Sequence, residues 1–161
     1  MGQDYTKHNL LFISKYPEII HEFTDAMKDR DIEIETAING IEAAAKIKKK
    51  NYDIVITGLS LEGYNGEQII TYLNKTAPST VCIIYTTTIS SAQLHFFINE
   101  RNVFRVFLRP VDFRGAFWEA LEEAYEYHAV QVKNEEDTGA RRQEQEKQER
   151  EIEIMDQRMR S

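Results

Sequence analysis

The chain has 161 residues, of which 42% are hydrophobic, and its formal net charge is −7. This length suits one well-buried core and is too short for two domains of ordinary size. The negative charge argues against nucleic-acid binding by this chain alone, because contacts to phosphates need a basic surface. The sequence shows no secretion signal and no apolar run of the roughly 20 residues that a membrane helix needs. We therefore expect a cytoplasmic protein without a membrane segment.

The first half of the chain alternates short apolar runs with helical patterns. Residues 9–13 form an apolar run that is too short for a helix, which predicts a buried strand. After Pro17, apolar residues recur at helical spacing, and residues 32–37 then alternate with period two, as in a more exposed strand. Residues 40–50 are alanine-rich and end in lysines, which favour the C-terminal end of a helix.

The second half repeats this alternation. We predict strands at 52–59, 80–88 and 102–108, and helices at 66–78, 90–100 and 112–128. Asp112 is the expected N-cap of the last helix. Its aromatic residues are expected to pack in the core and at the helix edge rather than around a cofactor; they are Phe113, Phe117, Trp118 and Tyr125. Cys82, the one cysteine, is expected to be a small core residue.

Five strands separated by helices predict an α/β fold with a parallel sheet, because a crossover helix must lie over a face of the sheet. We expect a doubly wound, flavodoxin-like sheet of five strands in the order 2-1-3-4-5. In such sheets the functional crevice lies at the carboxyl ends of the strands. The residues to inspect therefore follow Ile13, Leu59, Tyr85 and Leu108.

The segment VITGLSLEGYNG, residues 55–66, runs from a predicted strand into a glycine-rich loop. It resembles the third-strand signature of receiver domains of two-component response regulators, where the strand ends in the phospho-acceptor aspartate. Gly63 and Gly66 match the signature, Asn65 takes the place of a second aspartate, and Gly58 falls on the phospho-acceptor. The resemblance covers residues 9–128 and implies the receiver fold.

The other landmarks of the family also fall at strand ends. Ser14 and Lys15 stand where the resemblance implies two metal-binding acids, and Thr86 matches a family threonine or serine. Arg109, followed by Pro110, takes the place of a family lysine.

The loss of these acids changes what the domain can do. Phosphoryl transfer to an aspartate needs a carboxylate nucleophile and a divalent ion, and Mg²⁺ prefers carboxylate ligands. We therefore predict a degenerate, phosphorylation-independent receiver (a pseudo-receiver) with no catalytic residue, metal or cofactor. An enzyme is disfavoured, since no glycine-rich phosphate loop follows the first strand and no nucleophile–base pair is evident.

The cations at the strand ends leave two interpretations open. Lys15 and Arg109, with the hydroxyls of Thr86 and Thr87, could bind a small anion, which gives the alternative function of a ligand sensor. Otherwise Lys15 points to water or pairs with Glu62 in the adjoining loop.

Residues 129–161 differ in composition and are predicted to be a charged helical linker or the start of a coiled coil. Ile152, Met155 and Met159 lie at i, i+3 and i+7 and would begin an apolar seam. We expect an N-terminal tail over residues 1–8, and an output domain beyond Ser161 would suit a signalling linker.

A module without phosphorylation chemistry would act through protein contacts, and we expect a homodimer. The face of the fourth helix, fifth strand and last helix is where this family often pairs. Here it carries aromatic residues beside charges of both signs: Phe96, Phe97, Trp118, Arg101, Arg105, Glu119 and Glu123.

Overall fold

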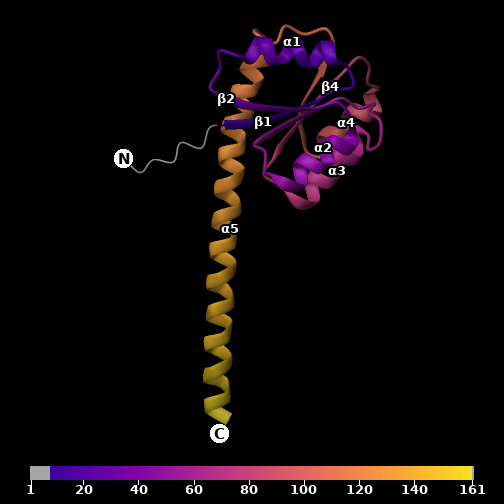
Figure 1. The fold of residues 1–161 in the computed structure, drawn as a ribbon. Helices are drawn as coiled ribbons and strands as arrows, with labels where there is room; N and C mark the ends of the chain where they lie inside the picture. Colours follow the sequence, from indigo (N-terminus) through magenta and orange to yellow (C-terminus); the bar gives the residue numbers. More distant parts are fainter. Residues whose placement is uncertain (1–7, 161) are drawn as a thin grey trace. The chain divides into compact units, whose positions relative to one another are not determined.

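The computed structural model describes residues 8–160 and has five strands and five helices in strict alternation (Figure 1). The elements are β1 His8–Ile13, α1 Pro17–Met27, β2 Ile32–Ala37, α2 Gly40–Lys49, β3 Ile54–Thr57, α3 Gly66–Thr76, β4 Val81–Thr86, α4 Ser91–Glu100, β5 Val103–Leu108 and α5 Ala116–Arg160. The strands are parallel and ordered β2-β1-β3-β4-β5, which confirms the predicted fold. Residues 1–7 of the predicted N-terminal tail lie outside the described residues.

By its contacts the chain divides into two compact units after His128, and each is described by itself. The first unit holds the sheet and both hydrophobic clusters. The second, residues 129–160 of α5, is helical and almost entirely exposed. No described helix combines the length and the apolarity that a membrane span requires.

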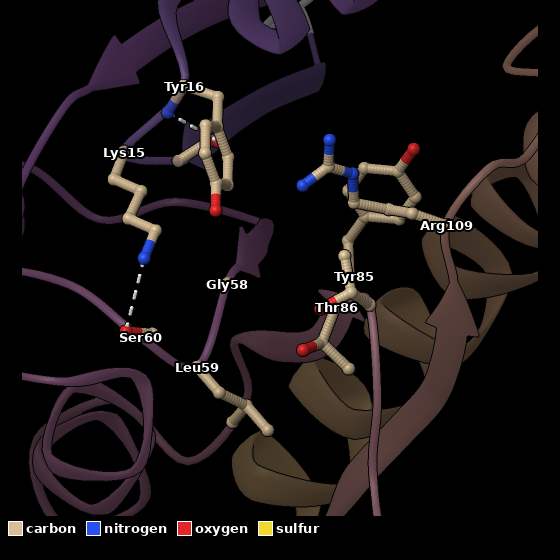
Figure 2. A pocket seen from close by; sticks show the side chains of 10 residues that line it. Lys15, Tyr16, Gly58, Leu59, Ser60, Tyr85, Thr86 and Arg109 are labelled. Atoms are coloured by element: carbon tan, nitrogen blue, oxygen red, sulfur yellow. Dashed lines mark hydrogen bonds between the residues drawn. The ribbon is translucent and has the colours of Figure 1, made fainter.

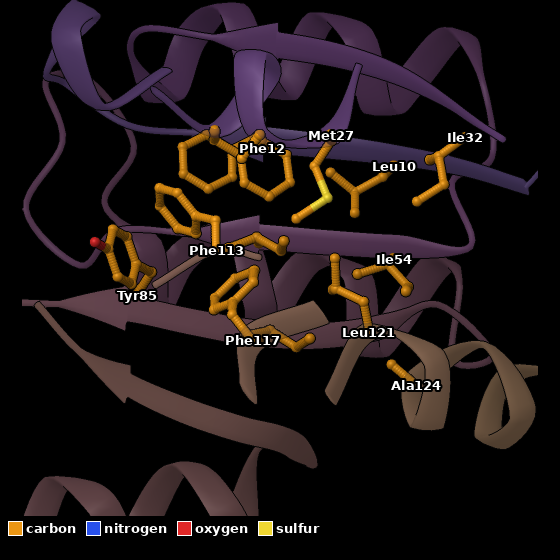
Figure 3. Close-up of a cluster of buried hydrophobic side chains, with 14 of the residues drawn as sticks. Leu10, Phe12, Met27, Ile32, Ile54, Tyr85, Phe113, Phe117, Leu121 and Ala124 are labelled. Atoms are coloured by element: carbon orange, nitrogen blue, oxygen red, sulfur yellow. The ribbon is translucent and has the colours of Figure 1, made fainter. Parts of the chain in front are cut away.

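Two hydrophobic layers form because successive side chains of a strand point to opposite faces of the sheet. In β1, Leu10 and Phe12 pack with α1 and the first turns of α5, whereas Leu11 and Ile13 pack with α2 and α3. The α1–α5 layer is rich in aromatic rings (Figure 3). Cys82 belongs to the other layer, and burial raises the pKa of its thiol to about 12.

Polar side chains fix where the helices begin. Asn39 accepts a hydrogen bond from the first turn of α2. Asn65 and Gln68 form a reciprocal capping box at α3, and Ser90 and Gln93 form another at α4. Each box satisfies backbone N–H groups that have no partner within the helix. Asn65, which stands where the family signature has an aspartate, thus has a structural role.

The last helix begins later than predicted. Asp112 accepts a hydrogen bond from the backbone N–H of Arg114 at 2.9 Å and so starts a turn, and α5 begins only at Ala116. Phe113, which lies in this turn, is still buried among the core aromatics. The third strand is also shorter than predicted, at residues 54–57 instead of 52–59.

The loop from β3 to α3 depends on close backbone approach. The Gly66 N–H donates to the Leu59 carbonyl at 2.9 Å, and a Cβ at Gly66 would lie 2.2 Å from the Gly58 carbonyl oxygen. Gly63 has a φ of +78°, which L-residues with side chains rarely adopt. These contacts give Gly63 and Gly66 structural roles in the loop.

A polar cluster closes the opposite end of the sheet, where β1 and β3 begin. His128 Nε2 lies 3.1 Å from Asp53 Oδ1, and its Nδ1 lies 2.8 Å from the Ser79 carbonyl oxygen. Each ring nitrogen of His128 thus lies within hydrogen-bonding distance of an acceptor. Burial alone would raise the pKa of Asp53, but hydrogen bonds from His128 and the Asn9 N–H outweigh it, so this pKa lies below its usual value.

The glycine contacts predict opposite outcomes for two similar substitutions. Gly66→Ala destabilises the fold, because displacing the loop backbone costs roughly 1–3 kcal/mol or more, which exceeds the roughly 1 kcal/mol that alanine contributes to a helix. Gly58→Ala changes stability by less than about 0.5 kcal/mol, because its Cβ would meet only ordinary contacts at 3.7 and 3.9 Å. Urea unfolding of both variants measures this. Equal losses would contradict the loop geometry.

The Asp53 cluster predicts an acid-side loss of stability. A carboxyl whose folded pKa is lowered stabilises the fold above its ordinary pKa of 3.8 in the unfolded chain, and it loses that contribution as pH falls through the folded value. Asp53→Asn should cost roughly 1–2 kcal/mol at pH 7 and much less at the lowest pH where the protein folds. Unfolding titrations of both proteins between pH 7 and pH 3 test this. A cost that does not vary with pH would mean that the ionised carboxylate is not involved.

Candidate functional site

The parallel register places four chain segments at one edge of the sheet. Ile13 pairs with Thr57, and Thr57 with Ile84, so β1, β3 and β4 end at nearly the same level. The ladder continues for one step beyond the strands, because the Gly58 N–H donates to the Ile13 carbonyl at 3.0 Å and the Arg109 N–H donates to the Thr86 carbonyl at 2.8 Å.

The residues that the sequence singled out line one pocket at this edge (Figure 2). Its volume is about 90 Å³. The lining residues are Ser14, Lys15, Tyr16, Gly58, Leu59, Ser60, Tyr85, Thr86, Thr87 and Arg109. They supply two cationic groups and several hydroxyls but no carboxylate. Within residues 8–160 no cluster of three or more His, Cys, Asp or Glu side chains could hold a metal ion.

Both cations of the pocket contact neighbouring side chains. Lys15 Nζ donates to Ser60 Oγ at 3.4 Å (Figure 2), and within the described part of the chain it forms no ion pair with Glu62. The Arg109 guanidinium lies 4.7 Å from the centre of the Tyr16 ring and 5.9 Å from that of Tyr85. Figure 2 shows the Tyr16 ring between Lys15 and Arg109. Such cation–π contacts hold a guanidinium in place without a carboxylate partner.

The hydroxyls are also engaged with the chain. Ser14 is 7% exposed, and its Oγ accepts the backbone N–H of Tyr16 at 3.2 Å. Thr86 Oγ1 donates to the Thr88 carbonyl at 3.4 Å. In Tyr85, burial raises the pKa of the phenol, and the positive charge of Arg109 opposes that rise. The hydroxyls of Ser14 and Thr86 thus have hydrogen-bond partners in the backbone of the chain.

Gly58 is not required by the backbone at this edge. A Cβ there would lie 3.7 Å from the Tyr85 carbonyl oxygen and 3.9 Å from that of Ile13, which are ordinary van der Waals distances. A Cβ therefore fits at the end of β3, and packing does not require glycine at residue 58.

The sequence did not point to the two tyrosines of the pocket. Tyr85 served only to mark the end of a predicted strand and Tyr16 received no role, but both rings contact Arg109. In the sequence, the position of Tyr16 between Lys15 and Pro17 was the feature that could have indicated its role in the pocket. It does not reveal that the ring turns toward the end of β5, because that contact depends on the path of a distant segment.

The predicted pairing face differs in detail from expectation. Phe97 is buried and lies in the core cluster of α2 and α3. Phe96 is partly covered by the Arg101 guanidinium, 4.7 Å from its ring centre. Trp118 contacts Arg30 at 4.3 Å, so its ring lies toward the connection between α1 and β2. The aromatic rings are therefore not the exposed part of this face.

The family model for the response regulator receiver domain matches residues 11–116, which is more than half of the chain. With the five-stranded order and the pocket at the strand ends, this shows that the chain belongs to the receiver domain family. Receiver domains are signalling modules of two-component systems, they generally interact with other proteins, and they are generally not enzymes. No curated protein matches the chain.

Solved structures resemble the fold at low sequence identity. The signal receiver domain of an HD domain-containing protein from Pseudomonas fluorescens Pf-5 is 19% identical, with a TM-score of 0.72 over 77% of this chain and 98% of that one. An adenylate cyclase structure from Rhodopirellula baltica is 19% identical, with a TM-score of 0.73 over 81% and 96%. Response regulator TrrA from Thermotoga maritima, solved with Mg²⁺–BeF, is 21% identical, with a TM-score of 0.62 over 73% and 98%.

Proposed function

We propose that this chain is a pseudo-receiver, a receiver domain that signals without phosphorylation, through protein contacts and self-association. One observation carries the proposal. The pocket at the strand ends has Gly58 where the family has its phospho-acceptor, and none of its lining residues has a carboxylate.

The physical argument concerns charge and nucleophilicity. Without a carboxylate at residue 58, no side chain of the pocket matches the aspartate that accepts a phosphoryl group in this family. A divalent cation would meet the ammonium of Lys15 and the guanidinium of Arg109 without an acidic ligand. The contacts of both cations with Ser60, Tyr16 and Tyr85 support a pocket that is stable without any ligand.

Self-association is proposed at the face of α4, β5 and α5. Leu94 and Ile98 of α4 are each 40% exposed, and Leu108 at the end of β5 is 50% exposed. Arg105 of β5 and Glu123 of α5 form an ion pair at 2.7 Å on the same face. Apolar side chains beside charges of both signs suit a self-complementary interface. We further propose that this pairing is relayed to residues 129–161; an output domain beyond Ser161 and a cytoplasmic location stay predictions.

The second candidate, a small-anion sensor, rests on the same pocket, where two cations meet the hydroxyls of Thr86 and Thr87. It is weaker, because both cations and the Thr86 hydroxyl already have partners in the chain. A native-state ligand raises thermal stability by mass action. Equal melting temperatures in phosphate and in chloride at equal ionic strength would exclude this candidate.

The lack of carboxylates in the pocket predicts that a phosphoryl donor does not modify the chain. Treatment with acetyl phosphate and Mg²⁺ leaves the intact mass unchanged, and it also leaves Gly58→Asp unchanged, because a nucleophile alone lacks acidic ligands for the metal. The matched control is the triple variant Ser14→Asp, Lys15→Asp, Gly58→Asp, which should gain one phosphoryl group. A phosphoryl adduct on the natural chain would overturn the pseudo-receiver proposal.

The pairing face predicts the effect of single charges on assembly. Sedimentation of the full chain should show a dimer, and Ile98→Asp should weaken it by roughly tenfold or more, since about 1.4 kcal/mol corresponds to a factor of ten. Ile41→Asp is the matched control, because Ile41 is 64% exposed on α2, outside this face. If the natural chain is a monomer at high micromolar concentration, or if both variants dissociate alike, the assigned interface is wrong.

A further inference from the structure

The second unit of the chain carries an uncharged stripe that continues well beyond its few apolar residues. Counting back from Met159 in steps of four and three defines nine positions, here named the seam: Gln131, Asn134, Thr138, Arg141, Gln145, Gln148, Ile152, Met155 and Met159. Eight of these nine residues are uncharged, whereas 15 of the other 23 residues between 129 and 160 are charged. Steps of four and three are the a and d positions of a heptad repeat.

This stripe lies on a helix that buries little within its own unit. Every residue whose side chain is described from Lys133 to Met159 is exposed. At the end of the seam Ile152 is 66% exposed, Met155 62% and Met159 85%. An isolated polar helix is marginal in water, and most helical stability comes from packing of one face. The seam is the only stripe at heptad spacing on this described segment that is nearly free of charge.

We propose that the seam pairs with the seam of a second copy as a parallel, in-register, two-stranded coiled coil. This inference rests on the proposed self-association, which brings two copies together. The direction follows from where the apolar residues lie. In a parallel pair Ile152, Met155 and Met159 each meet their own copies, whereas an antiparallel pair would set Met155 and Met159 against the polar Thr138 and Asn134.

The charges that flank the seam make the pairing weak and sensitive to salt. In a parallel pair, Asp137 faces Arg142 of the second copy, which is favourable, but Glu144 faces Glu149, which is not. Glu151 likewise faces Asp156 of the second copy. Arg141, the charged member of the seam, meets its own copy in a parallel pair, which is unfavourable, although Asp137 and Glu144 lie within one helical turn of it on the same helix.

Two flanking like-charge contacts per strand and the Arg141 pair oppose one attractive contact, so the seam alone gains little binding free energy. It gains more when the globular units already hold the two helices close, because the second contact is then intramolecular. Salt shortens the Debye length from about 10 Å at 0.1 M to about 3 Å at 1 M. Higher ionic strength should therefore strengthen the pairing instead of weakening it.

Cysteine cross-linking of the full chain tests the seam. Gln148→Cys places a thiol at a seam position, and Arg150→Cys places one on the outer side of the same helical turn; both positions are exposed. Cys82 is buried and stays in place, so the natural chain is the background control. Under mild oxidation Gln148→Cys should form the disulfide-linked dimer roughly tenfold faster than Arg150→Cys, because parallel seams hold the two thiols at a high effective concentration. The rate should rise further with added NaCl.

The other outcomes separate this inference from the proposed function. If neither variant cross-links but sedimentation still shows a dimer, the seam is wrong and self-association stands. If neither cross-links and the chain is a monomer, both proposals are wrong. Equal rates for the two variants would overturn the seam, as would cross-linking of Gln148→Cys only when it is mixed with Gln145→Cys, which is the result of an antiparallel pair.

Discussion

Parallel pairing in register brings residues far apart in the sequence to one edge of the sheet. β1, β3, β4 and β5 each end there, and the backbone ladder extends one residue beyond, to Gly58 and Arg109. Because the sheet fixes the backbone of these segments, the pocket has a shape that does not depend on a bound ligand. The binding properties of the pocket then depend on its side chains, which supply cations, aromatic rings and hydroxyls.

In this chain the residues that match the family signature shape the loop and the start of α3, and these structural roles do not depend on phosphoryl chemistry. Gly66 is required by its contact with the Gly58 carbonyl, and Gly63 by its positive φ, so both serve the loop. Asn65 caps α3, which needs a short polar side chain but no acid. Arg109 has two tyrosine rings as neighbours instead of a phosphoryl group or a carboxylate. Under the proposed function, the domain keeps its loop geometry and signals through its surfaces.

Much of the fold could be predicted because it depends on short-range periodicity. The apolar run of residues 9–13 and the apolar residues after Pro17 predict the burial of Leu10, Phe12 and Phe23, which the structure places in one layer. Six residues of the pocket could also be predicted, since parallel strands end at a common edge; they are Ser14, Lys15, Gly58, Thr86, Thr87 and Arg109. Their partners could not. Whether Lys15 meets Ser60 or Glu62 depends on rotamers and on the path of a loop 45 residues away. Which aromatic rings of the predicted pairing face point outward could not be predicted for a similar reason, because helical spacing does not say which neighbour covers a ring; Phe97 is buried, and Trp118 packs against the core and Arg30.

Amide NMR of the full chain with Mg²⁺ and beryllofluoride tests the central claim most directly. This ligand mimics a phosphoryl group, and it accompanies the Thermotoga maritima regulator described above. We expect that the amide signals of Gly58, Leu59, Thr86 and Thr87 do not move beyond the small, non-saturating changes produced by Mg²⁺ alone. Saturable shifts confined to these four residues would contradict this expectation, because they would mean that the pocket binds a phosphoryl mimic and its metal without the family's carboxylates.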